Sequence, residues 1–400
     1  MLSPRATETV RATLPVVRDV IATITGSFYR RLFSTHPELL RDLFNRGHQA
    51  NGTQRQALAG SIVAFATALV EHPDRRPDAM LSRIAHKHGS LGVSPGQYSV
   101  VHEHLRAALV ETLGEQATED VVAAWDEVYW LMANALIEIE RRLYLERGVL
   151  VGATWRPWEV VERVQETADV VTFQLRPADG RRIPRFRAGQ YVSVQVELPD
   201  GARQIRQYSL TNGPRSPLWS ITVKRVRGGE TVPDGEVSTF LHDHVREGDV
   251  LSVSAPYGDV VLPEEETPLL LASAGIGCTP MIAMLEELVD RGYQASVLAV
   301  HADRSPAHHA LRDDHERLVA KLAHGSAHVW YEHPEEGWPA ERTGLMDLSA
   351  IEIPDKVQAY LCGPLPFMRS IRTQLLDHGV PVSDIHYEVF GSDMWLAQGE

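Results

Sequence analysis

The apolar residues in the first 147 positions recur at the spacing of an α-helix. One amphipathic stripe continues for about six turns through residues 121–143, with apolar side chains three and four positions apart. Leu81, Ile84 and His88 share a second helical face, and no convincing alternating strand lies in this region. The pattern therefore predicts an all-α first domain over residues 1–147. The longer stripe consists of Val121, Trp125, Val128, Met132, Ala135, Ile139 and Leu143.

The hydrophobic period changes to two after a break at residues 148–155. Gly148 and Gly152, followed by Arg156-Pro157, end the helical region and predict a short linker. Turn sequences then separate alternating stretches, as expected for a small antiparallel β-barrel over residues 156–263. The alternating stretches are Gln190–Leu198, the segment with Trp219, Ile221 and Val223, and the segment with Leu251, Val253 and Ala255.

After residue 263 short apolar strands alternate with amphipathic helices. This order predicts an α/β domain with a doubly wound parallel sheet over residues 264–400. The predicted strands are Leu269–Ala272, Val297–His301, Val329–Tyr331, Ala359–Cys362 and Ile385–Val389, and the predicted helices are Met281–Arg291, Ala307–Leu322 and Phe367–His378.

Composition excludes several classes of protein. The chain has 400 residues, enough for two to three domains, with 44% hydrophobic and 23% charged residues, which is typical of a soluble globular protein. A net charge of −14 argues against nucleic acid or an anionic membrane as the main partner. Cys278 and Cys362 support neither a disulfide framework nor a zinc site. Without a signal-like start or a long apolar run, we expect a cytoplasmic protein with no stable membrane association.

The stretch Pro268–Ile282 combines an apolar run, a glycine turn and a helix start. Unpaired backbone N–H groups and the helix dipole at such a start favour a diphosphate. Because Pro280 stands near the place of the third glycine, the common dinucleotide fingerprint is incomplete. Taken alone, the motif is also compatible with an ordinary glycine-rich turn between a strand and a helix.

Two further motifs flank this glycine loop in the chain. Arg206-Gln207-Tyr208-Ser209 precedes it, and Cys362-Gly363-Pro364 follows it. Arginine can pair with a diphosphate as a fork, tyrosine offers a flat face to a flavin ring, and a serine hydroxyl can bond a ring nitrogen. The order resembles the ferredoxin-reductase type of flavin and nicotinamide module.

The resemblance implies two sets of ligand contacts. For FAD, they are Tyr191, Arg206, Gln207, Tyr208, Ser209, Gly235, Val237, Ser238, Glu388, Val389, Phe390 and Gly391. For NAD(P)H, they are Gly275, Ile276, Gly277, Cys278, Thr279, Pro280, Cys362, Gly363 and Pro364.

The whole chain resembles a flavohaemoglobin. The residues that carry this resemblance in the helical region are Tyr29, Phe44, Gln54, His88, Tyr98 and Glu140. It implies a globin with haem b, reduced through FAD by NAD(P)H, whose activity is nitric oxide dioxygenation and whose small partners are dioxygen and nitric oxide. We expect a monomer.

The resemblance also selects the proximal haem ligand. A lone helical histidine is more often a core or surface residue, and His86 and His88 point away from each other, which argues against a shared metal site. The same spacing argument excludes His102 with His104. Lys87-His88 matches the Lys-His of the family, so His88 is the expected iron ligand and Lys87 a haem contact. We interpret His242 and His244 as surface residues.

The remaining haem residues take their roles from the same resemblance. Tyr29 would donate its phenolic hydrogen to dioxygen with help from Gln54, and Phe44 would pack against the porphyrin. Tyr98 and Glu140 would hydrogen-bond the ligand histidine and raise its basicity. Without the family pattern, an exposed helix charge is the favoured interpretation of Glu140, and a half-buried packing residue is that of Tyr98.

Several alternatives stay open from sequence. An oxygen-binding or sensor protein with a self-reducing flavin, or a reductase that serves a separate acceptor, would use the same three regions. Arg304 fits a 2′-phosphate and also an ordinary surface arginine, so NADH and NADPH are not distinguished. The loop at 227–236 is longer than is usual in the family, and the chain ends atypically after Phe390-Gly391-Ser392.

Overall fold

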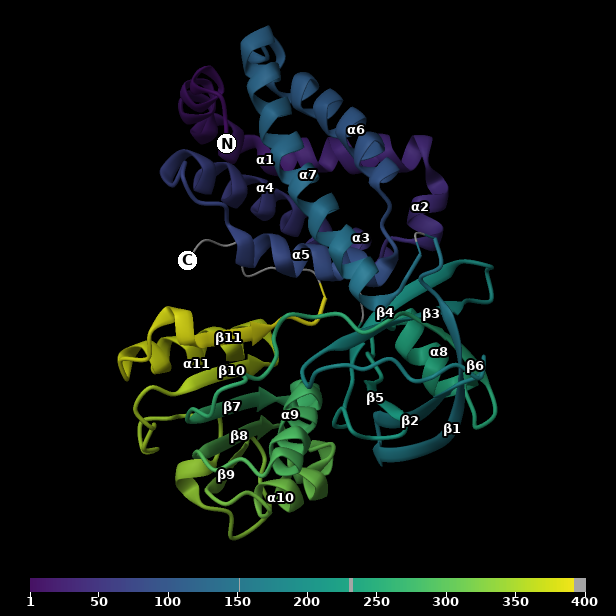
Figure 1. Cartoon of the computed structure of the whole chain (residues 1–400), viewed down its shortest axis with the longest axis vertical. Coiled ribbons are helices and arrows are strands. Elements are labelled where there is room, and N and C mark those ends of the chain that lie inside the picture. The colour runs from purple at the N-terminus through teal and green to yellow at the C-terminus, as the bar shows by residue number, and fades with distance from the viewer. Residues whose placement is uncertain (151, 230–232, 392–400) are drawn as a thin grey trace. The chain divides into compact units, whose positions relative to one another are not determined.

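The computed structural model describes residues 1–150, 152–229 and 233–391. These residues form two compact units (Figure 1). The first contains residues 1–155 and 195–206 together with Gly391, and the second contains residues 156–194 and 207–390. The expected boundaries of three domains stay a prediction.

The first 150 residues are helical, as the 3.6-residue period predicts. Ser3 caps the first helix by accepting a hydrogen bond from the Ala6 N–H at 3.2 Å, and Thr118 caps the last one in the same way with Val121. Gly148, at φ +62°, ends that last helix in the left-handed region. The helices are α1 Pro4–Thr35, α2 Pro37–Asp42, α3 Arg46–Ala50, α4 Thr53–Glu71, α5 Asp78–Leu91, α6 Pro95–Leu113, η1 Gly114–Gln116 and α7 Glu119–Arg147.

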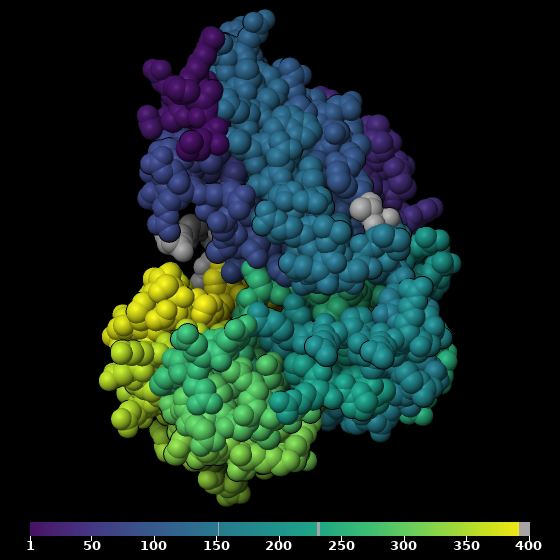
Figure 2. All heavy atoms as spheres, in the orientation of Figure 1, coloured from purple at the N-terminus to yellow at the C-terminus, as the bar shows by residue number. Residues whose placement is uncertain are grey.

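The helices of the first unit share one apolar core. Helix α1 packs against α4, α6 and α7, and α5 packs against α7. Val10 and Leu32 of α1, Phe65 of α4 and Leu81 of α5 are fully buried between them. Figure 2 shows the outer surface of this helical unit, coloured purple to blue.

A six-stranded sheet follows, with the strand order β4-β3-β6-β1-β2-β5. The backbone beyond β4 bridges to β5 through Leu210 and Ile221, which joins the two edges into a barrel. Inside it, the indole rings of Trp158 and Trp219 stack with centroids 3.8 Å apart. The elements are β1 Arg156–Thr167, β2 Val170–Pro177, β3 Tyr191–Glu197, β4 Arg203–Ser209, β5 Trp219–Lys224, α8 Glu236–His244 and β6 Val250–Val253.

Strands β1, β2 and β4 were not predicted from the sequence. Register irregularities interrupt β1 twice, which breaks its alternation, and β4 carries mainly polar side chains. The interpretation of His242 as a surface residue is wrong. It is buried on α8, with its Nε2 atom 2.9 Å from the Val223 carbonyl oxygen.

The last region is the predicted parallel sheet, with the order β11-β10-β7-β8-β9.

The helix predicted over residues 307–322 begins later than expected. Pro306–His308 forms a 3₁₀ turn and Leu311 has φ +58°, so α10 begins only at Arg312. The elements are β7 Leu269–Ala274, η2 Gly275–Gly277, α9 Cys278–Arg291, β8 Val297–Asp303, η3 Pro306–His308, α10 Arg312–Val319, β9 Gly325–Tyr331, η4 Ala340–Arg342, β10 Gln358–Cys362, α11 Leu365–Asp377, η5 Val382–Asp384 and β11 Ile385–Glu388.

Three buried histidines lie together in the second unit. The rings of His301 and His309 stack at 4.1 Å, and His315 lies 6.3 Å and 6.1 Å from them. Burial and the neighbouring histidines lower the pKa of His309 to about 2 and that of His315 to about 4. Both side chains are therefore neutral in the fold at pH 5–7.

These lowered pKa values predict acid sensitivity of the second unit. Below about pH 6.5 the unfolded chain binds protons that folded His309 and His315 refuse, so their contribution is present above that pH and is lost as pH falls toward 4. Each histidine adds a slope of up to about 1.4 kcal/mol per pH unit. We expect urea unfolding between pH 4.5 and 7.5 to show this slope, and His315→Leu to reduce it. The matched variant at the exposed His324, His324→Leu, should leave the slope unchanged; an equal change would contradict the assignment.

Candidate functional site

His88, Tyr98 and Glu140 meet inside the first unit. They lie on α5, at the start of α6 and on α7. The Nδ1 atom of His88 lies 2.9 Å from both the Tyr98 hydroxyl and Oε1 of Glu140, and the Tyr98 hydroxyl donates to the same Oε1 at 2.5 Å. One carboxylate oxygen thus accepts from two side chains that the sequence places far apart.

This contact determines the tautomer of His88. With its Nδ1–H donated to Glu140, a neutral imidazole leaves Nε2 as the nitrogen that can bind a metal. Burial, and then the Glu140 charge, raises the pKa of Tyr98, so Tyr98 remains a phenol that donates. Glu140 is only 2% exposed, so it is not the solvated helix charge of the alternative interpretation.

Aromatic side chains surround Tyr29 on α1. Its ring lies 4.7 Å from Phe28, 5.5 Å from Phe33 and 5.9 Å from Phe44. Burial raises the pKa of Tyr29, and the neighbouring side-chain amides of Gln54 and Gln49 offset only part of this rise. The phenol is therefore held protonated, next to two amides and inside an apolar surround.

Two members of this group were missed from the sequence. Gln49 lies on the short helix α3, whose five residues show no periodic pattern. Phe33 stands four residues after Tyr29 on α1, and this same-face spacing was the signal that could have identified it.

Lys87 and His48 lie near Gly391, also in the first unit. Lys87 donates from Nζ to the Gly391 carbonyl, and a Cβ at Gly391 would lie 3.0 Å from the His48 ring. Burial, followed by the charges of Lys87 and Arg206, lowers the pKa of His48 to about 4. His48 is thus a neutral ring beside two cations, and the sequence analysis did not identify it.

Arg206 is bound locally within the first unit. Its Nη1 donates to the Ile205 carbonyl at 2.7 Å and to Oε1 of Gln204 at 3.3 Å. The buried amide of Gln204 donates in turn to the carbonyls of Arg41, at 3.0 Å, and Phe44, at 3.2 Å. The backbone of Phe44 is therefore held by the strand segment that carries Arg206.

The other predicted flavin contacts lie in the second unit, apart from Gly391. Gln207 donates from Nε2 to the Ser193 hydroxyl at 3.1 Å, and Tyr191 is buried. The Ser209 hydroxyl is buried, and among the described residues it has no hydrogen-bond partner. Such an orphan hydroxyl fits a bound polar ligand, because an unmet buried donor is costly.

The predicted segment 235–238 forms the start of α8. The Ser238 hydroxyl donates to the Gly235 carbonyl at 3.0 Å and accepts from the Val226 N–H at 3.1 Å, while Val237 is buried. The side chain of Ser238 is thus occupied locally, and the first-turn N–H groups of the helix are what this segment offers to a phosphate. Glu388 ends β11, and Val389 and Phe390 follow it.

The glycine loop and the Cys362-Gly363-Pro364 motif are neighbours in the second unit. A Cβ at Gly277 would lie 2.2 Å from the Cys362 carbonyl oxygen, so only glycine permits this approach. Gly275 has φ +53°, and the turn 275–277 leads directly into α9, where Thr279 donates to the Ile276 carbonyl and Pro280 stands in the first turn. The two motifs and a helix start thus form one edge of the sheet.

Cys278 and Cys362 are free and buried. Burial raises the pKa of Cys278 to about 12 and that of Cys362 well above its usual range, so both are neutral thiols. Neither thiol is therefore activated as a nucleophile.

Two predictions concern residues outside those described. One concerns the long loop, of which residues 230–232 are not described, and the other concerns the tail 392–400.

Arg304 is half-exposed, with its Nη2 atom 3.6 Å from Oδ2 of Asp169. No helix within the described ranges is both long and apolar enough to cross a bilayer.

Three family models match successive parts of the chain. Residues 26–136 match the globin family, residues 157–262 the oxidoreductase FAD-binding domain, and residues 271–373 the oxidoreductase NAD-binding domain. These matches confirm the predicted fold class and the predicted haem, FAD and nicotinamide cofactors. A globin also indicates a gaseous ligand.

Relatives match over nearly the whole length. The flavohemoprotein of Halalkalibacterium halodurans is 40% identical over 410 residues, covering 99% of this chain and 98% of its own. The crystal structure of flavohemoglobin from Malassezia yamatoensis with bound FAD and heme is 36% identical, with a TM-score of 0.88 over 98% of this chain and 100% of that one. The FAD/NAD-binding domain of nitric oxide dioxygenase from Vibrio cholerae is 36% identical, with a TM-score of 0.55 over 60% of this chain and 99% of that one.

The buried carboxylate contact predicts a difference between two glutamates on α7. Glu140→Leu leaves the His88 N–H and the Tyr98 hydroxyl without their acceptor, and we expect it to lower the free energy of unfolding by about 3 kcal/mol. Glu138→Leu breaks only exposed ion pairs with Arg141 and Arg142 and should lower the free energy of unfolding far less. Urea unfolding of the full chain, followed by helical circular dichroism, measures both. Equal losses would show that the buried contact contributes nothing special.

Proposed function

Because the chain belongs to the flavohemoprotein family, we propose that it is an NAD(P)H-dependent nitric oxide dioxygenase, which converts nitric oxide and dioxygen to nitrate. The proposal rests on two clusters of polar residues that lie inside the same helical unit. One is the His88–Tyr98–Glu140 contact, and the other is Tyr29 with its two glutamines. The nitric oxide dioxygenase name of the Vibrio cholerae relative supports the same reaction.

The residues around His88 fit a haem. His88 would hold the iron through Nε2, because Nδ1 is engaged by Glu140. Phe44 and Lys87 are the proposed contacts to the porphyrin. Bound haem supplies the redox-active iron, and bound FAD converts the two-electron donor NAD(P)H into a source of single electrons.

Glu140 acts on the iron site through the histidine. A carboxylate that accepts the imidazole N–H raises the basicity of the ligand and favours oxygen chemistry over oxygen storage. Tyr98 donates to the same oxygen and so holds the carboxylate in place. This arrangement supports a dioxygenase in preference to a sensor or a storage globin.

Tyr29 would orient dioxygen on the other side. Its raised pKa keeps the hydroxyl protonated, so it can donate a hydrogen bond at neutral pH. The side-chain amides of Gln54 and Gln49 lie beside that hydroxyl, while Phe28 and Phe33 keep the surroundings apolar. Water is thereby kept from competing for the donor.

The residues predicted to bind FAD and NAD(P)H would deliver the reducing equivalents. The unpartnered Ser209 hydroxyl, with Gln207, Tyr208 and Tyr191, would hold the flavin ring. Arg206 and the start of α8 would hold its diphosphate. The glycine loop 275–280 and residues 362–364 would hold NAD(P)H, and 388–391 complete the proposed FAD contacts.

Tyr29→Phe tests the proposed donor. We expect nitric oxide consumption in air with NADH to fall by about 100-fold, because one positioned hydrogen-bond donor is lost. Anaerobic reduction of the haem by NADH should be unchanged, since Tyr29 is not assigned to electron delivery. A nitric oxide electrode and absorbance spectroscopy measure the two.

The matched control is Tyr144→Phe, which removes a hydroxyl that donates to the Val93 carbonyl at 2.8 Å in the same unit. It should leave nitric oxide consumption within a few-fold of the parent. Full activity in Tyr29→Phe would overturn the role of Tyr29, and absence of nitric oxide consumption in the parent would overturn the proposed function.

Glu140→Gln tests the action of the carboxylate on His88. A neutral amide accepts a weaker hydrogen bond, so we expect a lower iron–histidine stretching frequency by resonance Raman and a higher haem midpoint potential. His88→Ala should lose the haem absorbance band. An unchanged frequency in Glu140→Gln would contradict the assigned role, whatever its effect on turnover.

A further inference from the structure

Gln204 is a buried amide that joins two segments far apart in the chain. It lies near the start of β4, and its side chain is fully buried in the first unit. Its Nε2 atom donates to the carbonyl oxygens of Arg41, at 3.0 Å, and Phe44, at 3.2 Å. Its Oε1 atom accepts from the Arg46 backbone N–H at 3.4 Å and from Nη1 of Arg206 at 3.3 Å. Both ends of the amide are therefore engaged, and all of these partners except Arg206 lie where α2 ends and α3 begins.

Such a contact fixes the end of one helix and the start of the next. The last carbonyl groups of a helix and its first N–H groups have no partner within the helix. Gln204 supplies a partner to both kinds of group within residues 41–46, which we call the α2–α3 turn. The position of the turn therefore depends on a side chain from β4.

Two neighbouring contacts hold the same turn. The Arg203 backbone N–H donates to Oδ1 of Asp42 at 3.1 Å, and Nη1 of Arg46 lies 2.6 Å from Oδ2 of Asp200. The second contact is a partly exposed ion pair, which stabilises less than a buried hydrogen bond. Gln204 thus makes the buried part of the contact between the turn and the strand.

The α2–α3 turn carries or precedes residues that border Tyr29. The ring of Phe44 lies 5.9 Å from the ring of Tyr29 and 5.3 Å from that of Phe33. Gln49 lies on α3, and its side-chain amide lies beside the Tyr29 hydroxyl. Because α3 has only five residues, its position depends on the turn from which it starts. A displacement of the turn would therefore move both an aromatic ring and an amide relative to the phenol.

We propose that Gln204 is a positioning residue for the part of the haem site in which Tyr29 acts. It holds the α2–α3 turn, so that Phe44 and Gln49 keep the phenol of Tyr29 in one orientation. This role rests on the proposed function, which assigns Tyr29 to dioxygen. Gln204 acts through the turn and is assigned no contact with a ligand of the iron.

Gln204→Met tests this role, because methionine is unbranched, of similar length and without an amide. The full-length ferrous protein with haem and FAD is saturated with carbon monoxide, and its C–O stretching band is measured by infrared spectroscopy. We expect the band to shift toward its position in Tyr29→Phe. Dioxygen release, followed by stopped flow, should be faster by up to about tenfold, the effect of one lost hydrogen bond.

The iron–histidine stretching frequency distinguishes positioning from general destabilisation. It should stay unchanged in Gln204→Met without carbon monoxide, because the contact of His88 with Glu140 involves neither the α2–α3 turn nor β4. A loosened helical unit would alter this frequency together with the C–O band, and that result would overturn the positioning role.

Gln204→Glu separates the two ends of the amide. It keeps an oxygen for Arg46 and Arg206, and it replaces the N–H groups that bond the carbonyls of Arg41 and Phe44. A carboxylate oxygen repels those carbonyl oxygens, so we expect the C–O band to shift as in Gln204→Met. A band at the parent position in either variant would overturn the proposal.

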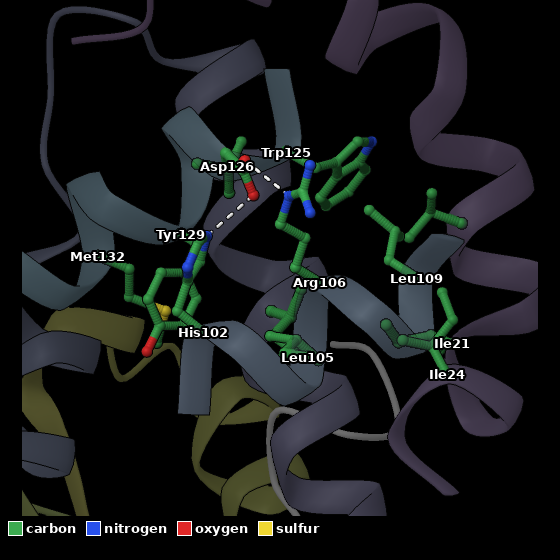
Figure 3. A pocket seen from close by; sticks show the side chains of 13 residues that line it. Ile21, Ile24, His102, Leu105, Arg106, Leu109, Trp125, Asp126, Tyr129 and Met132 are labelled. Carbon is green, nitrogen blue, oxygen red and sulfur yellow. Dashed lines mark hydrogen bonds and ion pairs between the residues drawn. The ribbon is translucent and has the colours of Figure 1, made fainter. Parts of the chain in front are cut away.

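Two matched controls lose polar side chains elsewhere in the first unit. Arg203→Met removes an exposed side chain next to Gln204 and keeps the backbone bond to Asp42. Arg106→Met breaks the pair with Asp126 between α6 and α7, drawn as a dashed line beside a pocket in Figure 3. Both should keep the parent band and the parent rate of dioxygen release. A shift in either control equal to that of Gln204→Met would overturn the assignment to Gln204.

The two proposals fail separately. The C–O band and dioxygen release are measured without nitric oxide, so a parent that consumes no nitric oxide loses the proposed function and can still show the positioning role. An active parent whose band is the same in both Gln204 variants loses the positioning role alone. If Tyr29→Phe itself leaves the band unchanged, the positioning role is overturned together with that of Tyr29.

Discussion

The buried carboxylate of Glu140 is the contact on which the helical unit depends. A carboxylate that leaves water is stabilised only when charged or polar partners replace its solvation. Here the partners are His88 and Tyr98, and they come from two other helices. The contact therefore does two things at once. It requires α5, α6 and α7 to pack in one arrangement, and it assigns the proton of His88 to Nδ1, which leaves Nε2 for a metal.

Desolvation also sets the protonation of other polar residues in the helical unit. Burial keeps Tyr29 a neutral phenol, and it keeps His48 a neutral ring beside Lys87 and Arg206. In the second unit the same effect keeps Cys278 a thiol. Burial thus makes Tyr29 a hydrogen-bond donor and Cys278 an unreactive packing group. The two residues differ in the groups that surround them. Tyr29 has two amides within reach, whereas the thiol of Cys278 meets a backbone carbonyl.

The hydrophobic period identified several elements correctly. The stripe through residues 121–143 became α7, and the alternation at 190–198 became β3. The period failed as a guide where the backbone departs from regular pairing or the side chains are polar, as in β1 and β4. It also misplaced the start of α10, because the left-handed backbone at Leu311 depends on packing. Gln49 and His48 lie on a five-residue helix that is too short to show any period.

The sequence alone determined the order of the three regions and the glycine turn before a helix. Through the family resemblance, it also predicted the residues of the site. These follow from backbone geometry and side-chain spacing over a few neighbouring positions. The tertiary structure decided which distant side chains touch. Tyr98 and Glu140 are 42 positions apart in the chain, yet the Tyr98 hydroxyl lies 2.5 Å from Oε1 of Glu140. Local patterns specify which face of each helix is apolar, but only the packing of those faces determines the distances between polar atoms that their side chains carry.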